Sequence, residues 1–192
     1  MSDRIYEIRW HGRGGQGAVT AARIVAEAAY LNGYRGVTAA PSFGAERRGV
    51  PVSASNRISR QPILILSQVA EPDIVVVLDQ TLLAYPDVTD GLQPGGSLIV
   101  NSARPPRDLG FNGKFNTVTA DATSICRELG LVLAGLTLVN IAMLGAFARA
   151  TRLVDMPGIT RVLKTRFSGK VLQANLTAVR RTSEVTRRDD GG

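Results

Sequence analysis

The sequence predicts an α/β domain with three layers, α/β/α, around a mixed, mainly parallel sheet. Segments with strand periodicity and segments with helix periodicity alternate along the chain. Residues 74–78 form a continuous, mostly β-branched apolar run, which is typical of a strand buried on both faces. A hairpin predicted over residues 50–66 makes the sheet mixed rather than purely parallel.

The first half of the chain begins with a strand, a glycine turn and a helix. Residues 5–10 alternate between apolar and polar, which predicts a strand with one buried face. Residues 19–31 carry apolar side chains at helical spacing, and Gly33 follows as a stop signal. Residues 40–49 break this periodicity and predict a long loop. Residues 50–58 and 63–66 predict the two strands of the hairpin, with Gln61 and Pro62 in its turn.

The second half predicts a further buried strand, a short strand and four helices. Asp79 follows the strand at 74–78, where it either binds a ligand or caps the next turn. Strands are expected at 97–100 and 118–120, and Asp121 is expected to cap a helix ending at residue 129. Residues 131–149 predict a buried helix with the polar Asn140 inside it, and 157–167 and 171–179 two more. The domain is therefore expected over 1–179, with a flexible tail over 180–192.

Composition limits the chemistry of this 192-residue chain. The single Cys126 excludes an internal disulfide and any iron–sulfur or zinc site made of cysteines from this chain alone, and the single His11 excludes a histidine pair. With 23 Lys+Arg against 16 Asp+Glu, the net charge of +7 favours anionic ligands or partners. Aromatic residues are only 5% and form no stacking platform, which argues against nucleic acid. The absence of a signal peptide or membrane span predicts a cytoplasmic location.

The glycine turn is the candidate binding site. Gly12, Gly14 and Gly17 spell G-x-G-x-x-G between the first strand and the first helix. Such a turn directs backbone N–H groups and the positive end of a helix at one point, which suits a phosphate. The alternative is a turn that only lets helix and strand pack closely. A dinucleotide site also needs an acidic residue about 20 positions further on, and residues 34–40 contain none.

Several segments in series resemble the gamma subunit of the 2-oxoacid:acceptor oxidoreductases, as in pyruvate:ferredoxin oxidoreductase and the pyruvate/ketoisovalerate oxidoreductases. The resemblance extends from about residue 5 to about residue 177. The segments that carry it are the glycine turn, Pro-Ser-Phe-Gly-Ala-Glu-Arg-Arg-Gly at 41–49, Pro-Asp-Ile-Val-Val-Val-Leu-Asp at 72–79, Ile-Val-Asn-Ser at 99–102, and Asn-Ile-Ala-Met-Leu-Gly-Ala at 140–146.

The resemblance implies a division of labour among subunits. The complex decarboxylates a 2-oxoacid, passes electrons through iron–sulfur clusters to ferredoxin or another acceptor, and releases an acyl-CoA. Thiamine diphosphate with Mg is held by the alpha and beta subunits, and the clusters by the delta and beta subunits. The gamma subunit covers the active site and helps to bind coenzyme A. No residue of this chain is assigned to bond-making chemistry or to a metal.

Residue by residue, the resemblance places coenzyme A at the glycine turn. The matching positions, expected to meet its phosphates or pantetheine arm, are Gly14, Gly15, Gln16, Gly17, Ala18 and Val19. Glu46, Arg47 and Arg48 match a charged loop that would meet either coenzyme A or a neighbouring subunit. Two alternatives stay open. One is a free-standing NADP-dependent oxidoreductase with Arg47 and Arg48 on the 2′-phosphate, and the other is a basic nucleic-acid-binding module.

Overall fold

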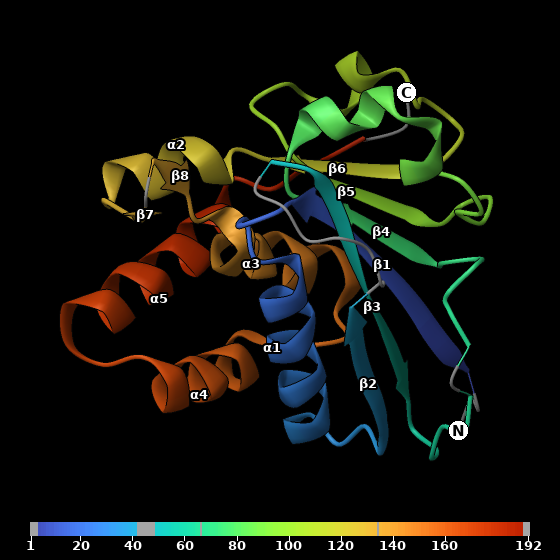
Figure 1. Cartoon of the computed structure of the whole chain (residues 1–192), viewed down its shortest axis with the longest axis horizontal. Coiled ribbons are helices and arrows are strands. Elements are labelled where there is room, and N and C mark those ends of the chain that lie inside the picture. The colour runs from blue at the N-terminus through green and yellow to red at the C-terminus, as the bar shows by residue number, and fades with distance from the viewer. Residues whose placement is uncertain (1–3, 42–48, 66, 134, 190–192) are drawn as a thin grey trace.

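The protein is built on a seven-stranded mixed sheet (Figure 1). The computed structural model describes residues 4–41, 49–65, 67–133 and 135–189. The sheet has the order β2-β3-β1-β4-β5-β6-β9. Strands β1, β4, β5 and β6 are parallel, whereas β3, β2 and β9 each run antiparallel to a neighbour. The strands are β1 (Ile5–Arg13), β2 (Gly36–Pro41), β3 (Pro51–Ser59), β4 (Ile74–Val77), β5 (Ser97–Asn101), β6 (Asn116–Ala120) and β9 (Arg187–Arg188).

Helices cover the two faces of the sheet unequally. Within the described residues, five α-helices contribute to one apolar cluster on the first face. They are α1 (Ala18–Leu31), α2 (Ala122–Glu128), α3 (Val139–Thr151), α4 (Met156–Arg166) and α5 (Gly169–Glu184). A smaller cluster on the second face, over β4 and β5, involves 3-10 segments and loops. The 3-10 helices are η1 (Gln80–Ala84), η2 (Pro86–Val88) and η3 (Pro106–Leu109). The predicted α/β class and mixed sheet are confirmed, with 3-10 segments forming the second outer layer.

A buried polar network joins the sheet to α1. The Trp10 ring packs against Phe147 of α3, with ring centroids 5.4 Å apart. Its indole N–H donates to the Asn56 side-chain oxygen at 2.8 Å. The Asn56 amide in turn donates to the carbonyls of Ala22 and Thr38, both at 2.8 Å. Every polar atom of this asparagine side chain is thereby used, so the network fixes β1, β2, β3 and α1 against one another.

The predicted hairpin is wrong, because β3 already has a partner on each side. It pairs with β1 along one edge and with β2 along the other. Residues 63–65 therefore form no strand, and Leu64 is 92% exposed. Leu66 lies outside the described residues. The strand β2 falls where no strand was predicted.

The predicted helix over 131–149 is shorter than expected. A two-stranded hairpin, β7 (Val132–Leu133) and β8 (Leu136–Thr137), precedes α3. Gly135 has φ 79°, a left-handed conformation that turns the chain between these strands. The Leu138 N–H then donates to the Leu131 carbonyl at 2.9 Å and closes the hairpin where α3 begins.

The predicted flexible tail from residue 180 is also corrected. Helix α5 continues to Glu184 with Thr182 fully buried, because its inner face packs against α3. The chain then adds β9 to the edge of β6, where Arg187 pairs with Thr119 and Arg188 with Val118. The described residues contain no helix long and apolar enough to cross a membrane.

His11 makes the stability of the fold depend on pH. Burial, together with the Arg9 guanidinium, lowers the pKa of His11 to about 4. The Arg9 Nε–H donates to its Nε2 at 3.0 Å, so the imidazole is the neutral acceptor. Between pH 6.5 and 4 the unfolded chain binds a proton at this residue that the folded chain does not, and stability therefore falls as the pH falls.

We expect the free energy of unfolding to drop by about 2 kcal/mol more in the wild type than in His11→Gln between pH 7 and 4.5. Glutamine keeps an oxygen acceptor for Arg9 but does not titrate. Urea unfolding at a series of pH values measures the difference. Parallel pH profiles for the two proteins would contradict a neutral His11 in the folded state.

Candidate functional site

The turn between β1 and α1 is closed by its own backbone and by Gln16. The Gln16 N–H donates to the Arg13 carbonyl at 2.9 Å, and the Arg13 N–H donates to the Gln16 side-chain oxygen at 2.8 Å. Gly15 and Gly17 have φ 93° and 77°, in the left-handed region that glycine adopts without strain. The sequence of this turn thus dictates its shape locally.

The N-terminus of α1 carries no side-chain cap. Gly17 is the N-cap residue, no side chain bonds to the cap, and the first turn contains no acidic residue. The first N–H groups of a helix have no partner inside the helix, and they carry the positive end of its dipole. This end of α1 is therefore prepared electrostatically for an anion.

Asp79 is held in an ion pair beside the turn. The Arg13 Nε–H donates to one carboxylate oxygen at 3.0 Å, and the Thr81 hydroxyl and N–H donate to the other at 2.6 and 3.0 Å. Burial alone would raise the pKa of Asp79, but the hydrogen bonds from Thr81 and the contact with Arg13 outweigh it and lower the pKa. Asp79 is the cap of η1, one of its two predicted roles, and Arg13 neutralises its charge.

A polar cavity of about 460 Å³ opens beside the turn, along the carboxyl ends of β4 and β5. This is the edge at which open α/β sheets bind ligands. Hydroxyl and amide groups dominate its wall, and Arg127 is the one cation among the lining residues described. The lining residues are Gln16, Leu78, Asp79, Gln80, Thr81, Asn101, Ser102, Ala103, Asp121, Thr123, Ser124, Arg127, Gly135, Leu136, Thr137 and Val139.

Asn101 fixes the floor of this cavity. Its side-chain amide donates to the Leu78 carbonyl at 2.9 Å and to the Thr123 hydroxyl at 2.8 Å, and its oxygen accepts from the Thr123 N–H at 3.2 Å. Beside it, the Ser102 hydroxyl donates to the Gln80 side-chain oxygen at 2.6 Å. The ends of β4 and β5 and the start of α2 are therefore held together by side chains that also face the cavity.

The structure brings together the predicted residues of the turn but not those of the charged loop. Gln16 lines the cavity, and Gly14, Gly15, Gly17, Ala18 and Val19 lead from it into α1. Glu46, Arg47 and Arg48 lie outside the described residues. Gly49, which follows them, donates its N–H to the Gly14 carbonyl at 3.2 Å and accepts from Arg13 at 3.0 Å.

Asn140 supports the turn from α3. It is 7% exposed and donates to the Gly17 carbonyl at 3.3 Å, which agrees with its prediction as a satisfied core residue. A Cβ on Gly17 would lie 2.9 Å from the Asn140 Cγ. Glycine is thus required here for packing as well as for backbone conformation.

The topology argues against a dinucleotide site. In a Rossmann unit the strand after the first helix is the parallel neighbour of the first strand. Here that strand is β2, which lies at the edge of the sheet and is separated from β1 by β3. In a dinucleotide site the residue that binds the ribose follows that neighbouring strand. Because β2 is not next to β1, no residue after β2 can take this place.

Arg127 is the residue that sequence reasoning missed. Among the described residues no carboxylate lies within 4 Å of it, although it faces the cavity from the exposed side of α2. Its sequence signal is weak, because a basic residue near the end of a short helix usually only faces solvent. The folding of β8 beside α2 is what gives this arginine a ligand-facing position.

The part of the chain that the structure describes has neither a metal centre nor a reactive thiol. Those residues contain no group of three or more histidine, cysteine or acidic side chains able to hold a metal ion. Burial raises the pKa of Cys126 to about 12, and its thiol donates to the Leu138 carbonyl at 3.4 Å. This confirms the prediction of a core thiol rather than a nucleophile.

Fold and site define an α/β domain with a glycine turn at the start of its first helix and a polar cavity at the carboxyl edge of its sheet. The family described as pyruvate ferredoxin/flavodoxin oxidoreductase matches residues 7–185. The chain belongs to this family, and the resemblance to its gamma subunits is confirmed.

Relatives of known identity match nearly the whole chain. The common gamma subunit of the pyruvate/ketoisovalerate oxidoreductases of Pyrococcus furiosus is 47% identical, over 94% of this chain and 96% of its own. Pyruvate synthase subunit PorC of Methanocaldococcus jannaschii is 44% identical, over 90% of this chain and 92% of its own. The crystal structure of pyruvate oxidoreductase subunit PORC from Thermotoga maritima has a TM-score of 0.83 at 36% identity. The match covers 97% of this chain and 99% of that one. The alternatives of an NADP-dependent oxidoreductase and a nucleic-acid module gain no support from these matches.

The packing of Gly17 is open to a direct test. We expect Gly17→Ala to lower the free energy of unfolding by about 2–4 kcal/mol, from left-handed strain plus the overlap with Asn140. Gly95→Ala is the matched control, because Gly95 has φ 73° and nothing within 4 Å of an added Cβ, so it should lose only about 1 kcal/mol. Denaturant unfolding measures both.

The double variant Gly17→Ala/Asn140→Ala isolates the overlap. Its loss of unfolding free energy should be smaller than the sum of the losses in the two single variants, because Asn140→Ala makes room for the methyl group at position 17. Additive losses, or equal losses for Gly17→Ala and Gly95→Ala, would show that Asn140 does not constrain the turn.

Proposed function

We propose that this chain is the coenzyme A-binding gamma subunit of a 2-oxoacid:acceptor oxidoreductase. The complex would convert a 2-oxoacid and coenzyme A to acyl-CoA and CO₂, with ferredoxin or another acceptor taking the electrons. Thiamine diphosphate with Mg, and the iron–sulfur clusters, would be held by the alpha, beta and delta partner subunits. This chain would supply binding groups and cover the active site.

One observation carries the proposal. The uncapped N-terminus of α1 adjoins, at Gln16, a polar cavity whose wall includes Arg127. A phosphate placed between them would accept backbone hydrogen bonds from the helix and a charge-assisted hydrogen bond from the guanidinium. The acidic groups in the wall are already engaged, since Asp79 is paired with Arg13 and Asp121 caps α2 by accepting from the Ser124 N–H at 2.9 Å.

The chemistry of the wall fits the diphosphate of coenzyme A and the polar arm attached to it. Hydroxyl and amide side chains such as Gln16, Thr123 and Thr137 can bond to the amide groups of that arm. The cavity volume of about 460 Å³ lies within the range of small-molecule sites. The proposal gives this wall a binding role and assigns the bond-making steps to the partner subunits.

Thr20→Glu tests the helix terminus. At the third helical position a glutamate can bond back to the N-cap N–H, and it places a negative charge at the positive end of α1. Helix stability should rise slightly, while the affinity of the assembled complex for coenzyme A should fall about tenfold. Calorimetric titration measures the affinity, and Thr20→Gln, with the same length and no charge, should lose much less. Equal affinity in Thr20→Glu and wild type would exclude this terminus as the phosphate site.

Arg127→Gln tests the facing cation. Loss of a charge-assisted hydrogen bond, about 1.5–3 kcal/mol, should weaken coenzyme A binding tenfold or more. Reduction of the clusters by the 2-oxoacid without coenzyme A should be unchanged. The matched control is Arg23→Gln, an exposed arginine of α1 outside the cavity wall. A loss shared by both variants would mean that net charge, and not a local contact, attracts the ligand.

A further inference from the structure

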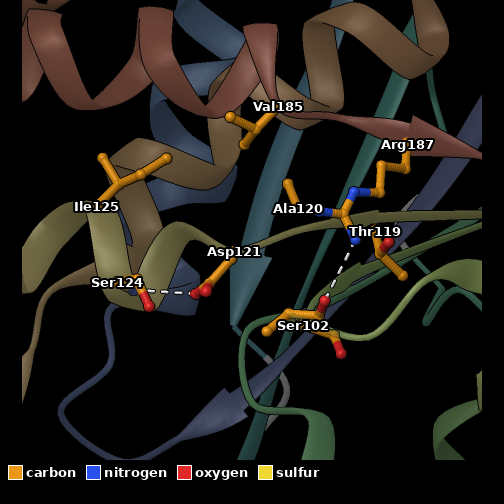
Figure 2. A pocket seen from close by; sticks show the side chains of 9 residues that line it. Ser102, Thr119, Ala120, Asp121, Ser124, Ile125, Val185 and Arg187 are labelled. Carbon is orange, nitrogen blue, oxygen red and sulfur yellow. Dashed lines mark hydrogen bonds between the residues drawn. The ribbon is translucent and has the colours of Figure 1, made fainter.

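A second, smaller cavity of about 280 Å³ adjoins the first at the β6–β9 edge (Figure 2). The two cavities share four lining residues: Ser102, Ala103, Asp121 and Ser124. A ligand in the first cavity can therefore extend into the second. Arg187, Thr119 and Val185 form the far side of this cavity.

Register places Arg187 and Thr119 directly opposite each other. They are antiparallel partners in the β6–β9 ladder, so their side chains project from the same face of the sheet. Figure 2 shows the Arg187 side chain reaching back from β9 toward Thr119 and Ser102. One Nη–H of Arg187 donates to the Ala103 carbonyl at 3.4 Å, which anchors the guanidinium at the cavity.

The charge of Arg187 is not neutralised by the described part of the chain. No described carboxylate lies within 4 Å of it, and one weak hydrogen bond uses only one of its five N–H donors. Besides Arg187, the titratable groups that line the two cavities are Asp79, Asp121 and Arg127. Asp79 is paired with Arg13, and Asp121 caps α2. Arg187 also lines a third cavity of about 710 Å³, together with Arg107, Arg149, Arg188 and Asp189.

Thr119 adds an independent sign of a ligand. It is 1% exposed, it lines the cavity, and its hydroxyl has no hydrogen-bond partner among the described residues. A buried hydroxyl without a partner is unfavourable, and such groups are rare in native proteins. A ligand oxygen beside Arg187 would satisfy this hydroxyl and the guanidinium together.

From this geometry we infer a second anion subsite, formed by the Arg187 guanidinium and the Thr119 hydroxyl, which takes a phosphate monoester. The inference rests on the proposed function: with the diphosphate of coenzyme A between α1 and Arg127, the subsite receives the phosphate on the ribose of its adenosine end. The shared wall of the two cavities allows one ligand to reach both sites.

The test compares coenzyme A with dephospho-coenzyme A, which lacks only that phosphate, by calorimetric titration of the assembled complex. In the wild type we expect coenzyme A to bind at least tenfold more tightly than the dephospho form. Arg187→Gln should remove most of this preference by weakening coenzyme A alone. Arg180→Gln is the control, because Arg180 is an exposed residue of α5 that lines neither cavity. This variant should keep the preference for coenzyme A.

Thr119→Val separates binding from structure. Valine keeps the branched shape and removes the unpartnered hydroxyl, so the melting temperature should be unchanged or higher. The preference for coenzyme A should nevertheless fall a few-fold. A lower melting temperature with an unchanged preference would assign the hydroxyl to the fold and overturn its part in the subsite.

The two proposals fail in different ways. If the wild type binds both forms equally, or if Arg187→Gln weakens both equally, the subsite is wrong, whereas the response to Thr20→Glu and Arg127→Gln still supports coenzyme A binding at α1. If neither form binds to the complex, the proposed function is wrong and the subsite falls with it.

Discussion

The site depends on one backbone position, the left-handed Gly17 packed against Asn140. At Gly17 the chain changes from the extended path of β1 to the first turn of α1. Because Asn140 belongs to α3, the same contact fixes the position of the glycine turn relative to α3. A side chain at Gly17 would push these two elements apart and would close the space at the start of α1.

The electrostatics of the site follow from how its charges are paired. The Asp79 carboxylate lies close to the turn, but Arg13 and Thr81 donate hydrogen bonds to it, and the rest of the cavity wall is dominated by neutral donors. Positive charge remains unpaired, in the described residues, at Arg127 and Arg187 and at the start of α1. Arg127 and Arg187 thus place positive charge at one edge of the sheet, where it can attract an anion.

The chain combines a rigid frame with an incomplete site. The Trp10–Asn56 network and the packing of Trp10 on Phe147 lock β1, β3 and the inner helices together. The cavity at the carboxyl edge, in contrast, is lined mainly by hydroxyl and amide groups that can bind a ligand. The family match and its relatives show that this frame belongs to the gamma subunit of a multi-subunit oxidoreductase.

The sequence alone determined the local elements: the β1–turn–α1 unit from its periodicity and glycines, the buried strands from their β-branched runs, and the cap at Asp121. Each of these depends on interactions within a few residues. Only the tertiary structure decided that β3 pairs with β2 and β1, so that 63–65 has no sheet edge to join, and that residues after Arg180 complete α5 and the β6 edge. It also brought Arg127 and Arg187 to the cavities. These outcomes depend on contacts between distant segments, which periodicity and spacing in one sequence do not encode.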